Sequence, residues 1–406
     1  MERRVVITGL GIWSCLGTNL DEVRQSLYSG KSGIIFSQAR KDAGFRSALC
    51  ADVPKADLKK YLSRDLRKLM PEEAQYGYLA TIQALEHAKL DQDFLDQNEV
   101  GVIYGNDSVA EATMQALDKF RQAGSTAACG SGAIFQSMNS TVTMNLATLL
   151  HLRGINPTAS AACASGSHSV GLGYLLIKDG LQDCIICGGA QEANMFSVAS
   201  FDGLMAFSTR EDEPTKASRP FDRDRDGLVP GGGAAPLVLE SYEHAVKRGA
   251  PILAEIVGWG FSGNGDHIST PNVAGPTRSL ELCLKNGGIN PRDIGYINAH
   301  ATSTHAGDGR EALAIANIFG DYRVPVTSTK SQTGHEMWMA GASELIYSIL
   351  MMKNDFIGGS LNFENPDEDT ACINVIPETR EAHFDMFLSN SFGFGGTNSS
   401  LIIKNL

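Results

Sequence analysis

Short apolar runs that end in or near glycine recur along the chain and are typical of buried strands. They lie at residues 5–9, 100–105, 184–188, 294–299 and 399–403. Longer stretches with helical patterns lie between several of them, at residues 74–88, 166–178 and 342–352. This alternation of strands and helices predicts a layered α/β fold.

Two parts of the sequence are weakly alike, which suggests an internal duplication. Residues 160–176 and 328–350 each run from a polar turn into a helix of small residues that reads as buried. A polar connection at 239–251 marks the expected boundary, so we divide the chain into halves 1–250 and 251–406. No segment rich in Pro, Ser or Gly interrupts the chain, and the two halves should therefore pack together directly.

Composition narrows the class of protein. Hydrophobic residues make up 43% of the chain, charged residues 20%, and there are 43 glycines, as in an α/β enzyme with many tight turns. The net charge of −12 argues against a general nucleic-acid binder, which needs a basic surface. No apolar stretch has the length of a membrane span, and the first apolar run is too short for an export signal. We expect a cytoplasmic protein without membrane insertion.

The eight cysteines are scattered and do not form the dense framework of a small secreted protein. Cys184 and Cys187 form a CxxC pair, but they lie in an apolar strand-like run without a second ligand pair nearby. We interpret them as buried structural thiols and predict no metal site.

Cys163 has the sequence context of a nucleophile. It lies in Ser160-Ala161-Ala162-Cys163-Ala164-Ser165-Gly166, where small residues allow a sharp turn into a helix. At a helix N-terminus the peptide dipoles favour a thiolate, so we expect a lowered pKa for Cys163. An amide of the same turn can also hydrogen-bond an oxyanion.

Two histidines follow strand-like or turn segments in the second half. His300 comes directly after the apolar run 294–299, and His335 ends the sequence Lys330-Ser331-Gln332-Thr333-Gly334-His335. Strand ends are where α/β folds build their sites, so these histidines are candidates for work beside Cys163. The glycine-rich segment 390–398 matches no phosphate loop or dinucleotide fingerprint, and its amides could instead face an oxyanion.

The segments around Cys163, His300, 330–335 and 392–398 resemble the β-ketoacyl-acyl-carrier-protein synthases I and II. The resemblance runs nearly end to end, with four motifs in the same order. It implies a thiolase-like, five-layered αβαβα fold made of two duplicated halves. It also implies an acyltransferase of fatty-acid elongation that condenses an acyl thioester with malonyl-acyl-carrier-protein.

The resemblance also implies roles for individual residues. Cys163 would carry the acyl chain, and His300 and His335 would be neutral hydrogen-bond donors to the malonyl thioester during decarboxylation. The remaining site residues implied by the resemblance are the Phe394 amide, which would bind an oxyanion, Lys330 with its partner Glu344, and the supporting Asp308. Thr302, Thr304 and Phe392 would bind the substrate. No cofactor is implied, because the substrates arrive on the phosphopantetheine of the carrier protein.

The implied partners are an acyl carrier protein and a second copy of the chain, with a heterodimer as an alternative. Because the carrier protein is acidic, a local basic dock is needed on this acidic chain. The candidates near the family's docking segments are Arg46, Arg64, Arg67 and Lys68.

Three departures from the family pattern bear on the substrate. Ala301 follows His300 where the family usually has glycine, Met337-Trp338-Met339 replaces smaller residues, and Asp107 stands in a stretch that is usually rich in glycine. A carboxylate at position 107 would fit poorly against a long alkyl chain. A specialised synthase of an aryl polyene or polyketide-like pathway therefore stays open, and a non-catalytic chain-length partner is less favoured because such partners typically lack the nucleophile. A thiolase is disfavoured because its C-terminal catalytic cysteine is absent.

Overall fold

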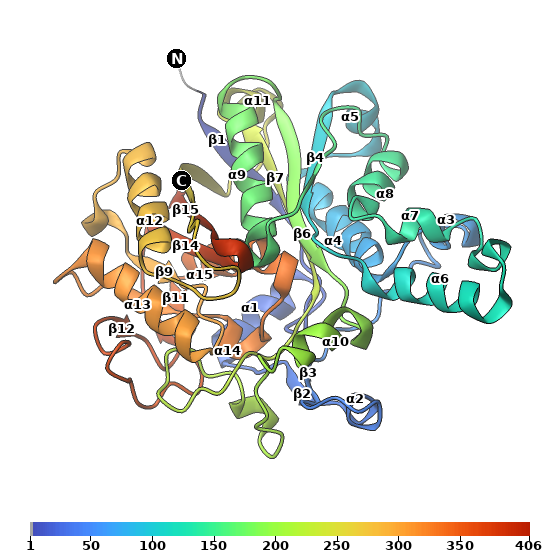
Figure 1. Ribbon diagram of the computed structural model, residues 1–406. Helices are drawn as coiled ribbons and strands as arrows, with labels where there is room; N and C mark the ends of the chain where they lie inside the picture. The colour runs from blue at the N-terminus through green and yellow to red at the C-terminus, as the bar shows by residue number, and fades with distance from the viewer. Residues whose placement is uncertain (1–2) are drawn as a thin grey trace.

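The computed structural model describes residues 3–406 and is dominated by one 11-stranded sheet (Figure 1). Its strand order is β12-β10-β9-β14-β15-β8-β1-β7-β6-β4-β5. The strands of the first half are β1 (Val5–Leu10), β2 (Ile34–Phe36), β3 (Leu49–Ala51), β4 (Val100–Gly105), β5 (Thr158–Ala159), β6 (Cys184–Gln191) and β7 (Gly233–Ser241). Those of the second half are β8 (Ala254–Gly263), β9 (Tyr296–Asn298), β10 (Pro325–Thr327), β11 (Phe356–Ile357), β12 (Asn374–Val375), β13 (Arg380–Glu381), β14 (Met386–Gly393) and β15 (Thr397–Asn405).

The helices lie between these strands. The first half contains α1 (Leu20–Ser29), α2 (Gln38–Asp42), α3 (Arg64–Arg67), α4 (Glu72–Ala88), α5 (Gln92–Gln97), α6 (Ala110–Ala123), α7 (Ala133–Ser137), α8 (Thr141–Leu149), α9 (Ser165–Lys178), α10 (Met195–Gly203) and α11 (Tyr242–Arg248). The second half contains α12 (Ala274–Gly287), α13 (His305–Phe319), α14 (Lys330–Thr333) and α15 (Ala340–Lys353). Across residues 3–406, no helix is both long and apolar enough to cross a membrane.

The duplication predicted from sequence is visible in the strand order. In the first half the strands run β5-β4-β6-β7-β1, and in the second half β10-β9-β14-β15-β8, which is the same order of equivalent elements. The strand directions also agree. In each set the first two pairings are parallel and the last two are antiparallel. The two sets join where β1 pairs with β8. Each half is therefore one copy of the same unit.

Helices and strands alternate in five layers, as predicted. The strands of each half form one layer, and helices lie between the two strand layers and on their outer sides. Helix α4 covers the outer side of β1, β6 and β7, whereas α12 covers β8 and β15. Helices α9 and α15 pack on each other in the middle, and each contacts strands of both halves. The two helices that follow the alike segments of the sequence are thus the central layer.

Small residues let the central helices approach closely. A Cβ on Gly166 of α9 would lie 2.9 Å from the Trp338 carbonyl oxygen, and one on Gly341 of α15 would lie 2.6 Å from Ser167. These contacts explain why the buried helical patterns at 166–178 and 342–352 are rich in glycine, alanine and serine. The N-terminal ends of the two helices meet, so their preceding turns lie side by side.

The segment 239–251 differs from the polar connection that we expected. It contains the end of β7 and the helix α11, whose first turn is capped by the Ser241 side chain. The second copy of the unit begins with β8 at Ala254. Amphipathic helical spacing in seven residues is too short to be distinguished from a polar turn by sequence pattern.

Candidate active site

Cys163 lies on a sharp turn between β5 and α9, in the short 3-10 turn Ala162–Ala164. Ala162 has φ 45°, a left-handed conformation that costs about 1–2 kcal/mol for a residue other than glycine. The Ser165 hydroxyl supports this turn, since it accepts the Ala161 N–H at 2.8 Å and donates to the Ala162 carbonyl at 2.6 Å. The turn directs the thiol toward a cavity at the N-terminal end of α9.

The pKa of Cys163 shifts in the direction opposite to our expectation. Burial raises the pKa of this thiol to about 11, although Lys330 and the backbone N–H groups of Phe394 and Cys163 favour the thiolate. The prediction of a lowered pKa was wrong because the dipole effect of a helix terminus is small compared with full desolvation of a charge. The resting group is therefore a thiol.

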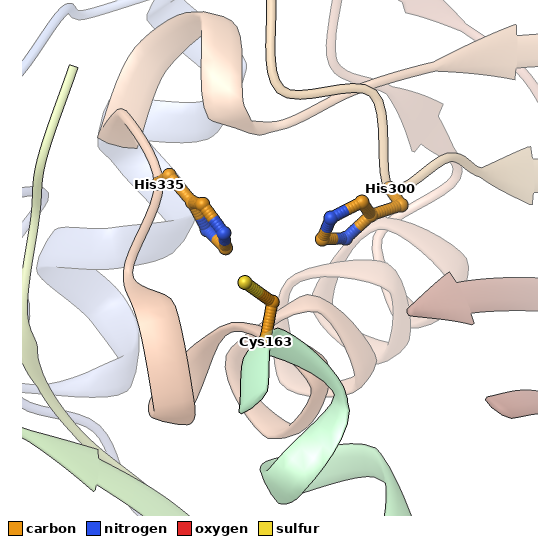
Figure 2. A group of neighbouring side chains, drawn as sticks. All are labelled: Cys163, His300 and His335. Atoms are coloured by element: carbon orange, nitrogen blue, oxygen red, sulfur yellow. The ribbon is translucent and has the colours of Figure 1, made fainter. Parts of the chain in front are cut away.

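Two histidines face this thiol from the second half (Figure 2). His300 follows β9, and His335 follows α14; both are buried. One ligand-type atom of each histidine and the Cys163 sulfur lie within 4.8 Å of one another. The imidazole rings meet edge to face, with 5.3 Å between centroids and an angle of 84°. The sequence prediction that these three residues share one site agrees with this geometry.

Both histidines are neutral hydrogen-bonding groups. Burial lowers their pKa values well below 6.5, and the positive charge of Lys330 adds to the shift. The Met337 N–H donates to His335 Nδ1 at 3.3 Å, so a neutral ring carries its proton on Nε2. A protonated Nε2 donates a hydrogen bond and has no lone pair for a metal. The arrangement therefore suits stabilisation of a negative oxygen better than metal binding.

A buried ion pair lies behind the histidines. The Lys330 ammonium bonds to the Glu344 carboxylate, and both side chains are 1% exposed. Burial raises the pKa of Glu344, while Lys330 opposes this shift. The pair keeps a positive charge near both imidazoles, which helps to hold them unprotonated.

Glu311 on α13 also supports the site, and the sequence analysis did not identify it. Its carboxylate accepts the N–H groups of His300 at 2.9 Å and Ala301 at 2.7 Å, and the Asn390 amide at 3.1 Å. Burial raises the pKa of Glu311 to about 7. A single glutamate within a helical pattern gives no signal of this role, since only the fold brings it under the His300 loop.

Asp308 on α13 is fully buried and is hydrogen-bonded to the segment around Phe221. It accepts the Phe221 N–H at 2.8 Å and lies 3.8 Å from the Arg225 guanidinium. Burial raises the pKa of Asp308 to about 6. Its contacts tie the segment around Phe221 to α13, which fits the supporting role implied by the resemblance.

The cavity in front of the thiol has a volume of about 320 Å³. Cys163, His300 and His335 line it together with four other predicted residues, Thr302, Thr304, Phe392 and Phe394. The two threonine hydroxyls are 3.1 Å apart. The structure therefore gathers the predicted nucleophile, histidines and substrate-binding residues around one space.

Two departures from the family pattern lie close to this cavity. Trp338 belongs to the same apolar cluster as Cys163, and its ring centroid is 6.3 Å from that of Phe201, which lines the cavity. The indole N–H is buried and has no acceptor among residues 3–406. Ala301 is buried, and its N–H is one of the donors to Glu311. The larger residues therefore fill the wall around the nucleophile and leave the three-residue centre intact.

The predicted docking residues fall into two groups. The Arg46 side chain donates to the Phe207 carbonyl at 2.6 Å and lies near α10, whose Phe201 lines the cavity. The other group lies on or directly after α3, beside α7: Arg64 is exposed, Arg67 donates to the Leu62 carbonyl, and Lys68 pairs with Asp65. Within one chain these residues do not form a single cluster.

Comparisons with known proteins agree with this geometry. Residues 2–245 match the family model "Beta-ketoacyl synthase, N-terminal domain", and residues 253–364 match "Beta-ketoacyl synthase, C-terminal domain". The chain is 41% identical to the 3-oxoacyl-[acyl-carrier-protein] synthase 1 of Haemophilus influenzae, over 99% of each chain.

Solved structures give the same picture. A β-ketoacyl synthase from Burkholderia phymatum is similar over 100% of both chains, with a TM-score of 0.95 and 37% identity. A second similar structure, described as a type II PKS acyl-carrier protein in complex with its ketosynthase, has a TM-score of 0.90 and 27% identity over 100% of both chains.

Proposed function

The chain belongs to the β-ketoacyl synthase family, and from this we propose how its residues carry out the reaction. The protein is an acyltransferase, a 3-oxoacyl-acyl-carrier-protein synthase that performs the condensation of fatty-acid elongation. We propose the roles of single residues, the carrier dock and the assembly.

The first half-reaction moves an acyl group to Cys163. The sulfur attacks the thioester carbonyl of the acyl carrier protein, the bond to the pantetheine sulfur breaks, and the thiol proton of Cys163 passes to that sulfur. The amides of Cys163 and Phe394 stabilise the oxyanion of the tetrahedral intermediate. The high pKa of the thiol means that deprotonation accompanies attack instead of preceding it.

The second half-reaction forms the carbon–carbon bond. The Nε2–H of His335 and a ring N–H of His300 donate to the thioester oxygen of malonyl carrier protein, where charge builds as carbon dioxide leaves. The enolate carbon then attacks the acyl carbonyl on Cys163, and the Cys163 sulfur leaves and regains a proton. Lys330, paired with Glu344, keeps both rings neutral, and Glu311 holds the backbone of the His300 loop in place.

The observation that carries this proposal is the proximity, within 4.8 Å, of one thiol sulfur and two imidazole nitrogens that line the same cavity. We would incubate wild type and Cys163→Ala with acyl carrier proteins and then malonyl carrier protein, and follow both by mass spectrometry. Acylation confined to Cys163, followed by an elongated product, is expected. Acylation of another residue, or elongation by Cys163→Ala, would contradict the assignment.

We propose that the cavity receives the phosphopantetheine arm of an acyl carrier protein. The similar ketosynthase seen in complex with a carrier protein supports a carrier-bound substrate. Thr302 and Thr304 would hydrogen-bond the arm, and Phe392 would contact the substrate. Arg46 beside the cavity, with Arg64, Arg67 and Lys68 beside α7, would attract the acidic carrier.

We propose that the chain forms a homodimer and acts in the cytoplasm. Helices α6 and α7 project from the body (Figure 1), and Asn139 after α7 lies 3.5 Å from Ser160, directly after β5, which is an edge strand of the sheet. They expose large apolar side chains, namely Met114, Leu117, Phe120, Ile134, Phe135 and Met138. An apolar arm next to an open sheet edge is typical of a protein interface. Pairing with a different subunit is the alternative assembly.

A further inference from the structure

Asp107 contacts the turn that carries the nucleophile. It follows β4, and its Oδ2 accepts the Ala162 N–H at 3.1 Å, one residue before Cys163. The carboxylate thus bonds to backbone, although we expected it to disturb the acyl pocket. We propose that Asp107 is a positioning residue, which fixes the left-handed turn at Ala162 and with it the direction of the Cys163 thiol and N–H. This inference rests on the proposed role of Cys163.

The hydrogen bonds of the turn explain why an outside acceptor is needed. The Ala161 N–H and the Ala162 carbonyl both bond to the Ser165 hydroxyl, and the Ala161 carbonyl accepts the Ala164 N–H at 3.1 Å. These backbone groups therefore have hydrogen-bond partners within the turn. The Ala162 N–H points out of the turn, and Asp107 supplies its acceptor. Without that acceptor, this donor and the left-handed conformation of Ala162 lose their support.

Asp107 is itself held between the turn and the projecting arm. Asn139, which follows α7, donates its side-chain amide to the Asp107 carbonyl at 2.9 Å. Asn106 donates to the Asn139 carbonyl at 3.0 Å, and Ser160 donates to the Asn106 carbonyl at 3.0 Å. The backbone that carries Asp107 is therefore held by groups on both sides.

The charge of Asp107 has a second effect, which opposes the first. A carboxylate near the thiol disfavours the thiolate and adds to the raised pKa of Cys163, after the larger effect of burial. Position and charge can be separated by substitution. Asp107→Asn keeps an oxygen that can accept the Ala162 N–H but removes the charge, whereas Asp107→Ala removes both.

The test uses the full-length protein and two readouts. One is the rate of Cys163 alkylation by iodoacetamide between pH 7 and 11, followed by peptide mass spectrometry; the other is the rate of acyl transfer from an acyl carrier protein. Both variants should shift the alkylation profile to lower pH. Acyl transfer should stay within about threefold of wild type in Asp107→Asn and fall about tenfold or more in Asp107→Ala, because misplacement of a reacting group is costly.

Asp21→Asn on α1 is the matched control, since it removes the same charge from an exposed residue that pairs with Arg24. It should leave both readouts unchanged, and a thermal melt should show that each variant is folded. Equal acyl transfer in wild type, Asp107→Asn and Asp107→Ala would overturn the positioning role. Failure of the nucleophile assignment would appear differently, as acyl transfer by Cys163→Ala, while the alkylation profile would still report on Asp107.

Discussion

At the scale of single residues, burial sets the chemistry of the centre. It keeps Cys163 a thiol and the two histidines neutral, although the sequence places the cysteine at a helix N-terminus. The hydrogen bond from Met337 then selects the tautomer of His335. Neutral imidazoles can donate hydrogen bonds toward a developing negative charge, which is the role that we propose for them.

This tautomer predicts the effect of substituting His335. His335→Ala should lower malonyl decarboxylation by about 10²–10³, the usual cost of one oxyanion donor. His335→Gln should retain more activity than His335→Ala, because its amide N–H can reach toward the position of Nε2. Both variants should still accept an acyl group on Cys163, measured by mass spectrometry. Loss of acylation in the glutamine variant would instead place His335 in the first half-reaction.

At the scale of elements, Glu336 fastens the His335 turn to α15. Its carboxylate accepts hydroxyl hydrogen bonds from Ser343 at 2.5 Å and Tyr347 at 2.9 Å. Burial raises the pKa of Glu336 to about 7. The folded state thus holds this proton more tightly than the unfolded chain, whose pKa is about 4.5. The protonated Glu336 carboxyl therefore stabilises the folded state below pH 4.5, and this contribution is lost as the pH rises toward 7.

Glu336→Gln should therefore weaken the pH dependence of stability. From pH 5 to pH 8, the free energy of unfolding of wild type should fall by about 1–3 kcal/mol more than that of the variant, since one pKa unit corresponds to about 1.4 kcal/mol. Urea denaturation at both pH values measures this difference. Glu243→Gln on the surface of α11 serves as a control and should show no such change. A variant as pH-dependent as wild type would contradict the assignment.

The crossing of the central helices gives a second prediction at this scale. Gly341→Ala should destabilise the protein by about 1–3 kcal/mol, because the added methyl group would meet Ser167 and the Ser391 hydroxyl. Gly203→Ala is the control, since no atom of the described part of the chain lies within 4 Å of the added Cβ. Unfolding by urea compares the two. Equal stability of both variants would mean that α9 and α15 separate easily.

At the scale of the whole molecule, the projecting arm predicts the assembly. Leu117→Glu combined with Ile134→Glu should convert the homodimer to a monomer, because both side chains are exposed and apolar on α6 and α7. Sedimentation velocity measures the mass. Val246→Glu, which changes an equally exposed apolar residue on α11, should leave the dimer intact. A wild-type monomer in dilute solution would refute the proposed dimer.

The arm that we assign to assembly also lies beside part of the proposed carrier dock. Arg64, Arg67 and Lys68 lie beside α7, and Asp107 connects to the same region through Asn139. The surface that we assign to assembly is thus next to part of the proposed carrier dock and to the turn of the nucleophile. Loss of the dimer should therefore reduce acyl transfer as well as mass.

Much of this protein follows from local sequence. Apolar runs and helical patterns predicted the layered α/β fold, and two alike segments predicted the duplication that the strand order displays. The family resemblance implied one site for Cys163, His300 and His335, and a ligand-type atom of each lies within 4.8 Å of the others. The fold features can be read from sequence because strands, helices and sharp turns depend on residues close together in the chain, whereas the site joins distant residues and followed from the order of the family motifs.

The tertiary structure decided what depends on residues far apart in the chain. Glu311 beneath the His300 loop, Asp107 against the Ala162 N–H and the division of the basic residues into two groups have no local signature. The pKa of Cys163 was predicted in the wrong direction for the same reason, because desolvation is imposed by the surrounding fold and exceeds the effect of the adjacent helix. The sequence alone determined which groups are available, and only their burial and long-range contacts determined how those groups ionise and point.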